Sequence, residues 1–225
     1  MSREAFLNRV RDAAVRGQAY RVTTQSLPDR VGYVGAGSDL CDCLAAEIVA
    51  VGGEAFVADD LLAARAIVAQ LCLEAGATSA LCWEHELLER LGLTELLTSL
   101  NIQRVARREL DSLDAKEQRL RALSAGIGIT SCELAVAETG SLLMCARPGR
   151  ERMASLLPPL HVAVVERAQI LPDLYDAIAH LQSLGSKGLP SNAVFITGPS
   201  KTGDMELELT TGVHGPGRWC VVVVK

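Results

Sequence analysis

Apolar residues recur along this chain with two spacings, one typical of amphipathic helices and the other typical of buried strands. Residues 2–16 place apolar positions between arginines at helical spacing, which predicts an amphipathic helix that ends at Gly17. Between residues 30 and 124, short runs that are apolar almost throughout alternate with longer helical segments. This alternation predicts βαβ units, and therefore a mostly parallel sheet with helices on both faces. The predicted strands span residues 30–34, 53–58, 78–83 and 102–106, and the predicted helices span about residues 39–51, 60–75, 84–99 and 113–124.

The pattern changes at about residue 125, where turns rich in glycine and threonine separate shorter apolar runs. The runs at 133–137 and 142–146 are joined by a Thr-Gly turn, which favours an antiparallel hairpin or a sharp kink rather than another βαβ unit. Further strands are expected at residues 161–165, 193–196 and 219–224, with a helix at 172–184.

The sequence shows no internal repeat and no low-complexity tract that would mark a linker. Its 225 residues, 49% of them hydrophobic, are sufficient for a sizeable core. We therefore expect a single α/β domain of Rossmann-like architecture over residues 1–225. It comprises an N-terminal helix (1–17), a βαβ layer (30–124) and a second half (125–225) that bears the motifs described below.

Charge and hydropathy narrow the class of protein further. The formal net charge of −5 and the isoelectric point near 5.4 provide no general basic field, which argues against a nucleic-acid partner. No stretch is long and apolar enough to span a bilayer, and the N-terminus carries charges every few residues instead of a signal-peptide core. We expect a cytoplasmic protein without a transmembrane segment.

The seven cysteines lie mostly inside apolar runs, where a free thiol acts as a small hydrophobic group. Cys41 and Cys43 form the only close pair, and neither a CxxC motif nor an iron–sulfur spacing occurs. The spacing therefore predicts reduced thiols and no metal or cluster bound by this chain.

A glycine pair at a predicted strand-to-helix turn resembles part of a dinucleotide-binding fingerprint. Gly35 and Gly37 follow a strand, and the acids Asp59 and Asp60 end the next strand. Leu40 occupies the place of the third glycine, and an incomplete motif of this kind is common in parallel sheets. We predict that no nicotinamide or flavin nucleotide binds here.

The densest collection of polar and flexible residues lies at residues 197–217, between two apolar runs. Such a segment is expected to form a loop at the rim of a buried sheet, where free backbone amides can meet an anion. The pair Lys201-Thr202 resembles the end of a P-loop, but Ser200 stands where a glycine is required. The segment is therefore interpreted as a binding loop of another kind.

This loop offers one cation, Lys201, together with hydroxyl groups and two carboxylates, Asp204 and Glu206. The structural alternative is that Asp204 or Thr202 caps a short helix while Lys201 is solvated. Residues 205–209 alternate with period two, so a strand is as compatible with the pattern as a helix.

Histidines supply the next candidates. His214 lies between glycines, where an imidazole can donate to an anionic ligand or transfer a proton near neutral pH. Its structural alternative is a turn residue whose ring binds a backbone carbonyl. His161 begins a strand and is compatible with either a core position or a ligand contact. His85 and His180 are expected on helix surfaces.

The segment Glu138-Thr139-Gly140-Ser141 places an acid at the tip of a strand, followed by two hydroxyl residues. This arrangement can hold a substrate hydroxyl, or supply a general base or a nucleophile. Three arginines follow that could form a bidentate contact with a carboxylate or phosphate, although exposed arginines are more often solvated: Arg147, Arg150 and Arg152.

Four motifs of the second half occur in a specific order and spacing. They are Ala137-Glu138-Thr139-Gly140-Ser141-Leu142, Arg152 with Leu156-Leu157-Pro158-Pro159-x-His161, Gly198-Pro199-Ser200-Lys201-Thr202-x-Asp204-x-Glu206, and Gly212-Val213-His214-Gly215-Pro216. Together they resemble the motifs of the LUD domain family over about residues 125–225, whereas the N-terminal half resembles it only in topology. Lys201, Ser141 and Gly203 stand where that family usually has arginine, threonine and alanine.

The resemblance implies an α/β fold similar to the superfamily of ribose-phosphate isomerase, glucosamine-phosphate deaminase and CoA transferases. It also implies lactate utilization, in which L-lactate is oxidised to pyruvate together with two other proteins, and iron–sulfur clusters in those partners carry the redox centres. The chain itself is then expected to hold no cofactor, to bind a small anionic metabolite and to depend on its partners for electron transfer.

The roles of single residues follow from their chemistry. Glu138 would orient a substrate hydroxyl or take a proton, Lys201 would neutralise a carboxylate or phosphate, Asp204 would hold Lys201, and His214 would donate to the ligand. These four side chains are expected to open onto one hollow. The catalytic candidates are Glu138 and His214, and the ligand-binding candidates are Thr139, Gly140, Ser141, Arg152, His161, Gly198, Ser200, Lys201, Thr202, Asp204, Glu206 and Gly215.

A second class of function remains compatible with these residues. The chain could act as a free-standing enzyme of isomerase or transferase type on a small phosphorylated or CoA-linked metabolite, with Glu138 as base or nucleophile. Co-purification with cluster-bearing proteins would support the lactate-oxidising assembly, whereas turnover of a sugar phosphate or acyl-CoA by the isolated chain would support the enzyme.

Overall fold

The computed structural model describes residues 2–18, 37, 39–105, 110, 112–203 and 209–225. Its contacts divide the chain into two units, Met1–Val34 and Gly35–Lys225. In the first unit, α1 (Arg3–Gln18) confirms the predicted N-terminal helix and exposes Phe6, Leu7 and Val10. The strand predicted at 30–34 and the turn residue Gly35 lie outside the described residues.

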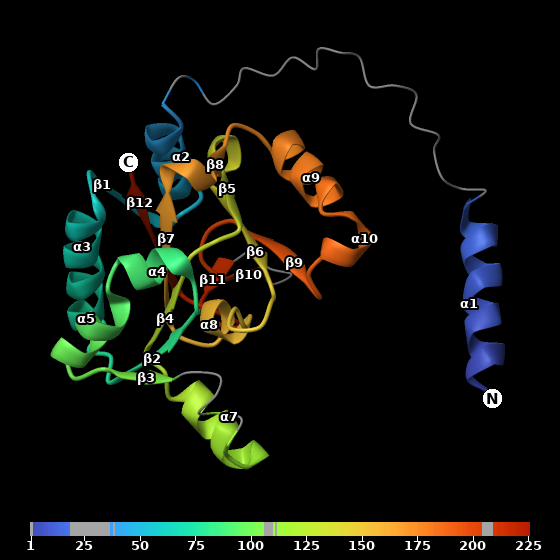
Figure 1. Ribbon diagram of the computed structural model, residues 1–225, viewed down its shortest axis with the longest axis horizontal. Helices are drawn as coiled ribbons and strands as arrows, with labels where there is room; N and C mark the ends of the chain where they lie inside the picture. Colours follow the sequence, from blue (N-terminus) through green and yellow to red (C-terminus); the bar gives the residue numbers. More distant parts are fainter. Residues whose placement is uncertain (1, 19–36, 38, 106–109, 111, 204–208) are drawn as a thin grey trace. The chain divides into compact units, whose positions relative to one another are not determined.

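The second unit is built on a six-stranded sheet in which every described pairing is parallel (Figure 1). The central strands consist almost entirely of buried residues, so both faces of the sheet are covered, as a parallel sheet requires. This confirms the predicted α/β fold with a parallel sheet. The strands in spatial order are β1 (Glu54–Ala58), β12 (Arg218–Val224), β7 (Leu160–Glu166), β4 (Ile127–Thr130), β2 (Ser79–Cys82) and β3 (Gln103–Val105).

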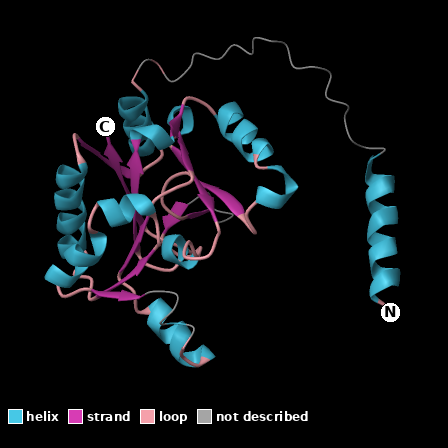
Figure 2. Ribbon diagram, in the orientation of Figure 1, coloured by secondary structure: helices cyan, strands magenta, loops and turns pink. Residues whose placement is uncertain are grey.

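Helices surround the strands of this unit (Figure 2). Aspartates cap four of them, because each side chain accepts a hydrogen bond from one or more backbone amides of the first turn: Asp39, Asp60, Asp114 and Asp173. The described helices are α2 (Leu40–Ala50), α3 (Leu61–Glu74), α4 (Glu86–Arg90), α5 (Leu93–Ser99), α7 (Ala115–Leu123), α8 (Met153–Leu156), α9 (Leu174–Ser183) and α10 (Gly185–Gly188). None of the helices in the described ranges has both the length and the apolar content needed to cross a membrane.

The single helix predicted at residues 84–99 is wrong, because two short helices occupy this region. Gly92 separates α4 from α5 with a left-handed backbone, φ 70°. The guanidinium Nη1 of Arg65 donates to the carbonyl oxygens of Leu91 and Gly92 at 3.0 and 2.6 Å. These carbonyls are thus bound by a side chain of α3, and the chain turns between the two helices.

A second sheet contains the predicted hairpin. β5 (Leu134–Val136) and β6 (Ser141–Cys145) pair in antiparallel fashion and confirm it, while β8 (Ile170–Leu171) and β9 (Ala193–Ile196) flank them. The loop at 197–217 therefore runs from β9 of this sheet to β12 of the parallel sheet, rather than along the rim of one sheet. Within the loop, β10 (Lys201–Gly203) and β11 (Leu209–Thr211) form a short antiparallel ladder.

Two glycines allow the second sheet and its loop to approach the end of α2. Gly140 has φ +62°, and a Cβ atom there would lie 2.7 Å from the carbonyl carbon of Glu47. Gly198 has φ +85°, and a Cβ atom there would lie 2.7 Å from the carbonyl oxygen of Val51. A side chain at either position would push the backbones apart, so these motif glycines have a packing role.

Candidate functional site

A pocket of about 240 Å³ lies where the loop after β9 meets the first residues of β7 and β12. Five of the candidate residues line this pocket: His161, Gly198, Ser200, His214 and Gly215. The remaining lining residues are Ser155, Leu156, Phe195, Ile196, Pro199, Pro216 and Trp219. The structure thus brings together parts of three separate sequence motifs.

Backbone hydrogen bonds hold the two arms of the loop against each other. The amide of Ser200 donates to the carbonyl of Pro216 at 2.9 Å, and the amide of Gly212 donates to the carbonyl of Ser200 at 2.9 Å. A Cβ atom on Gly215 would lie 3.1 Å from the Cβ of Ser200, so glycine keeps the arms close together. His214 is exposed on this loop and at the same time contributes to the pocket lining.

His161 is the most deeply buried polar residue of the site, with no exposed surface. Its Nε2 lies 2.8 Å from the hydroxyl of Thr130, which is also fully buried. Burial lowers the pKa of the imidazole from 6.5 to about 3, because the charged form would lose its hydration. His161 is therefore a neutral hydrogen-bonding group at physiological pH, and its Nδ1 has no partner among the described residues.

Trp219 completes the pocket and was not a candidate from the sequence. It pairs in register with His161 across β12 and β7, and only 2% of its surface is exposed. Its indole Nε1 has no hydrogen-bond partner among the residues that the structure describes. A tryptophan at the start of an apolar strand reads as a core residue, and only the strand order shows that it adjoins His161.

Glu138 has a different environment from His214. Its Oε1 accepts from the amide of Leu174 at 2.8 Å at the beginning of α9, and its own amide donates to the carbonyl of Pro172. Glu138 is not among the residues that line the pocket. The expectation that Glu138 opens onto a hollow with His214 is therefore not met, because its carboxylate binds the first turn of a helix instead.

The hydroxyl residues that follow Glu138 form a short chain of hydrogen bonds. The hydroxyl of Thr139 donates to Ser141 at 2.8 Å, and Ser141 shares a hydrogen bond of 2.7 Å with Thr197. This chain joins the beginning of β6 to the residue before Gly198, and so connects two of the sequence motifs. Thr139 and Ser141 do not line the pocket themselves.

Lys201 follows Ser200 directly, but its ammonium Nζ donates to the carbonyl of Val51 at 2.7 Å. This carbonyl belongs to the C-terminal cap of α2, where a cation is favourable. Lys201 and Thr202 are absent from the pocket lining. Asp204 and Glu206 lie outside the described residues.

Arg152 is exposed at the start of α8 and lines a smaller adjoining hollow of about 40 Å³. That hollow shares Ser155, Leu156 and Ile196 with the pocket. Arg152 is therefore close to the pocket without forming its wall.

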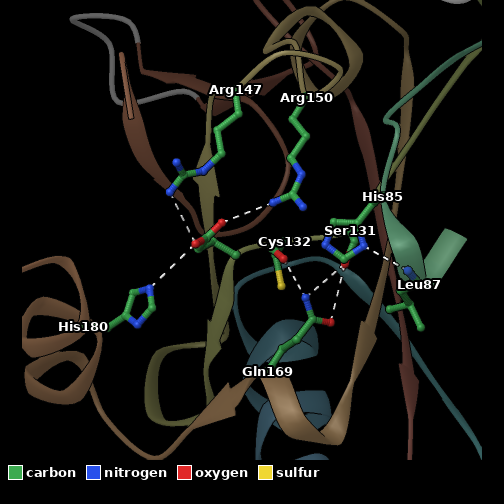
Figure 3. A network of polar contacts seen from close by, with 9 residues as sticks. His85, Leu87, Ser131, Cys132, Arg147, Arg150, Gln169 and His180 are labelled. Atoms are coloured by element: carbon green, nitrogen blue, oxygen red, sulfur yellow. Dashed lines mark hydrogen bonds and ion pairs between the residues drawn. The ribbon is translucent and has the colours of Figure 1, made fainter. Parts of the chain in front are cut away.

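A larger groove of about 1020 Å³ carries three arginines, Arg147, Arg150 and Arg152. Arg147, Arg150 and His180 lie 3.7, 3.3 and 3.7 Å from the carboxylate oxygens of Glu133. Figure 3 shows these three side chains directed toward one carboxylate. Because Glu133 already binds two of the guanidinium groups, the groove offers less free positive charge than its sequence predicts. We therefore do not regard it as the principal anion site.

Other polar residues near this groove have structural roles. His85 was predicted to lie on a helix surface, but it is the N-cap of α4. Its Nδ1 accepts a hydrogen bond from the amide of Leu87 at 3.2 Å (Figure 3). Burial and the nearby Arg150 lower the pKa of His85. The amide of Gln169 donates to the Ser131 hydroxyl and to the carbonyl of Cys132, at 3.1 and 2.6 Å.

Two further positions bear on cofactor chemistry. Asp60 accepts from the amide of Ala63 at 2.7 Å as the N-cap of α3, so the second acid of the incomplete dinucleotide fingerprint has a structural role. Within the described ranges, no group of three or more His, Cys, Asp or Glu side chains is placed to hold a metal ion. Burial raises the pKa of several thiols, among them Cys72 to about 11 and Cys82 to about 12.

Comparison with known proteins gives consistent results. The sequence model of the LUD domain matches residues 42–224. Lactate utilization protein C of Shouchella clausii is 33% identical over 150 residues, and that of Halalkalibacterium halodurans is 32% identical over 154 residues. These alignments cover 66% and 68% of this chain but only 63% and 65% of the relatives, less than two thirds of their length. Lactate utilization protein C of Anoxybacillus flavithermus is 28% identical over 226 residues, which is 98% of both chains.

Among solved structures, a DUF162 family protein from Deinococcus radiodurans has a similar fold. Its TM-score is 0.58 at 19% sequence identity, and the match covers 83% of this chain and 96% of the other. At this level of identity, the likeness concerns the fold alone.

Proposed function

Because this chain belongs to the LUD domain family, we propose that it is a lactate utilization protein that binds a small organic acid in the pocket of His161, Ser200 and His214. In this proposal it acts as the non-redox subunit for the oxidation of L-lactate to pyruvate. The observation that carries the proposal is that three motifs, far apart in the sequence, contribute polar groups to one small pocket. The relatives named lactate utilization protein C support the choice of metabolite.

The size of the pocket limits the ligand. A water molecule occupies about 30 Å³ in the liquid, so a pocket of about 240 Å³ corresponds to about eight water volumes. Lactate and pyruvate are small enough to be enclosed. CoA would have to extend far beyond the pocket, and the dianionic group of a sugar phosphate would meet no lysine or arginine in the pocket lining, which makes the isomerase or transferase alternative the weaker one.

The polar lining suits an oxygen-rich ligand. The hydroxyl of Ser200 and the imidazole of His214 can each donate a hydrogen bond, while Leu156, Phe195 and Ile196 provide apolar walls. An acid with a short carbon chain has both kinds of surface. The same lining has too few polar side chains to bind the many polar groups of a large polar molecule.

Oxidation of lactate to pyruvate releases two electrons and two protons, so an electron acceptor is required. We assign that role to iron–sulfur partner proteins, because the described residues hold no group of three or more side chains placed to bind a metal, and because burial of the thiols disfavours the thiolate form that binds iron. We also propose that the fold is similar to that of the ribose-phosphate isomerase and CoA transferase superfamily, and this analogy concerns the fold and not the activity.

Isothermal titration calorimetry of the full chain tests the ligand. L-lactate or pyruvate should bind with saturation, whereas ribose 5-phosphate and CoA should not. Ser200→Ala and His214→Ala should each weaken binding by about tenfold, since each removes a hydrogen bond to the ligand. Lys201→Ala is the matched control, because Lys201 adjoins Ser200 but its ammonium binds the end of α2, and it should bind as the parent does.

Absence of binding for both acids, or parental affinity in both pocket variants, would refute the assignment of the ligand. The partner role is tested separately in extracts from cells that lack the chain. Added parent protein should restore lactate-dependent reduction of a dye, and the Ser200→Ala variant should restore less. If the extract that lacks the chain reduces the dye with lactate as fast as an extract that contains it, the proposed role beside partner proteins is refuted.

A further inference from the structure

Leu156, the last residue of α8, lies at the junction of three hollows. It lines the pocket of about 240 Å³, the adjoining hollow of about 40 Å³ and the large groove that carries the arginines. Within the described part of the chain, no other residue lines both the pocket and the groove. Leu156 therefore lies between the ligand pocket and the space beyond it.

Close backbone contacts fix the position of Leu156. Gly128 of β4 packs against the carbonyl oxygen of Ala154, and a Cβ atom on this glycine would overlap with that oxygen. At the end of the helix, a Cβ atom on Gly215 would lie 3.8 Å from the carbonyl oxygen of Leu156. The loop that carries His214 and Gly215 thus adjoins the end of α8, which places Leu156 at the wall of the pocket.

Two other residues are shared by the pocket and the small hollow, but both have structural roles. Ser155 is only 4% exposed, and its hydroxyl donates to the carbonyl of Arg152 at 3.0 Å. Ile196 belongs to β9 and pairs with Leu142 of β6. Leu156, in contrast, is 45% exposed and therefore open to the hollows that it lines. Its side chain can be shortened without loss of a strand contact or a hydrogen bond.

The volumes of the two spaces limit the length of the ligand. The pocket corresponds to about eight water volumes, whereas the hollow of about 40 Å³ holds little more than one. At about one non-hydrogen atom per water volume, lactate with its six atoms fits the pocket, and 2-hydroxyhexanoate with nine needs space beyond it. The hollow is lined mainly by apolar residues, among them Trp83, Met144 and Val194, and so suits the end of an alkyl chain.

We propose that Leu156 is the specificity-determining residue of the pocket, because its side chain separates the pocket from the apolar hollow and restricts the ligand to short 2-hydroxy or 2-oxo acids. This inference rests on the proposed function and names the residue that limits the length of the acid. A shorter side chain at this position joins the two spaces. The alkyl chain of a longer acid then enters the hollow, while its oxygen atoms remain in the pocket with Ser200 and His214.

Calorimetric titration of the full chain with L-lactate and (S)-2-hydroxyhexanoate tests the proposal. The parent should bind the longer acid at least about tenfold more weakly than L-lactate, because the additional carbons find no room. Leu156→Ala should reverse this preference and bind the longer acid at least as tightly as L-lactate. The reason is that each methylene group buried in the joined space contributes about fourfold in affinity.

The neighbouring leucine provides a matched control. Leu157 is 43% exposed and lines the groove, but it lines neither the pocket nor the small hollow. Leu157→Ala should therefore keep the ratio of affinities of the parent. Leu156→Met conserves the volume of the side chain and should also keep this ratio. Thermal unfolding shows whether each variant is folded, and if Leu156→Ala is not, Leu156→Val should shift the ratio by at least about threefold.

The outcomes separate this inference from the proposed function. If the parent binds L-lactate but binds the longer acid equally well, or if Leu156→Ala keeps the preference of the parent, the role of Leu156 is refuted and the proposed function stands. An equal change of preference in Leu157→Ala has the same meaning, because the effect would then come from a general loosening of this segment. If the parent binds neither L-lactate nor pyruvate, both proposals fail.

Discussion

Acidification should destabilise this protein through His161 before the carboxylates begin to titrate. The folded imidazole has its pKa lowered from 6.5 to about 3 by burial, whereas in the unfolded chain it titrates normally. Above about pH 6.5 both states are neutral and the residue contributes nothing to pH dependence. As the pH falls from about 6.5 toward 3, the unfolded state takes up a proton that the folded state does not, so the free energy of unfolding decreases.

The magnitude follows from proton linkage. Each pH unit in this window corresponds to about 1.4 kcal/mol for one proton. From about pH 7 to pH 5, the loss attributable to His161 is therefore about 2 kcal/mol. A domain of ordinary stability has only about 5–15 kcal/mol in total, so the loss is large enough to measure.

Urea unfolding, followed by circular dichroism at pH values between about 7 and 5, measures this effect. The control is His161→Asn, which removes the titrating group and leaves His85, whose pKa is also lowered, in place. The parent should lose about 2 kcal/mol more than the variant over this interval. Equal pH dependence in the two proteins would show that the imidazole is solvated or paired in the folded state, and would refute the reasoning.

Three further predictions concern packing, an ion pair and the thiols. Gly140→Ala should lower the free energy of unfolding by about 3 kcal/mol because of backbone overlap with α2, while Gly76→Ala, which has φ +56° but open space around it, should cost only about 1 kcal/mol in the same urea assay. Arg218→Lys removes a fork that contacts Glu54 at 2.6 and 2.8 Å and should cost at most about 1 kcal/mol, because both side chains are partly exposed. It should also reduce the loss of stability below about pH 5, because Arg218 lowers the pKa of Glu54 in the folded state and the unfolded chain therefore takes up a proton first. Equal costs at the two glycines, or an unchanged acid response in the lysine variant, would contradict these readings. Brief treatment with iodoacetamide, analysed by mass spectrometry, should modify Cys43 first, since it is the only half-buried thiol among the seven; earlier modification of another thiol would show that the fold opens there.

Local features of the sequence were sufficient to predict most of the elements. The runs that became β1, β2, β7 and β12 consist mostly of apolar residues, and the Thr-Gly turn between β5 and β6 makes a hairpin from neighbouring residues. Whether a run forms a strand, and whether two runs close into a hairpin, depends largely on neighbouring residues. Periodicity and turn chemistry are therefore enough to predict these elements. The break at Gly92 was missed because it also depends on Arg65, which lies on another helix.

The candidate site was only partly predictable for the same reason. The histidine and glycine motifs pointed to His161, Ser200 and His214, and the structure brings them together. Glu138 and Lys201 were equally prominent as charged motif residues, yet their side chains bind α9 and the end of α2. A charged residue beside glycines serves a ligand or a helix end equally well, and only the position of the helix decides between them.

The sequence by itself determined the family motifs, the α/β alternation and the set of polar residues available to a ligand. The tertiary structure decided that the last strand, β12, enters the sheet between β1 and β7, which places Trp219 beside His161. That pairing joins residues nearly sixty positions apart. It is made by backbone hydrogen bonds, which do not depend on the identity of the side chains. The order of strands, and with it the composition of the pocket, results from packing of the whole core and is not encoded in any local pattern.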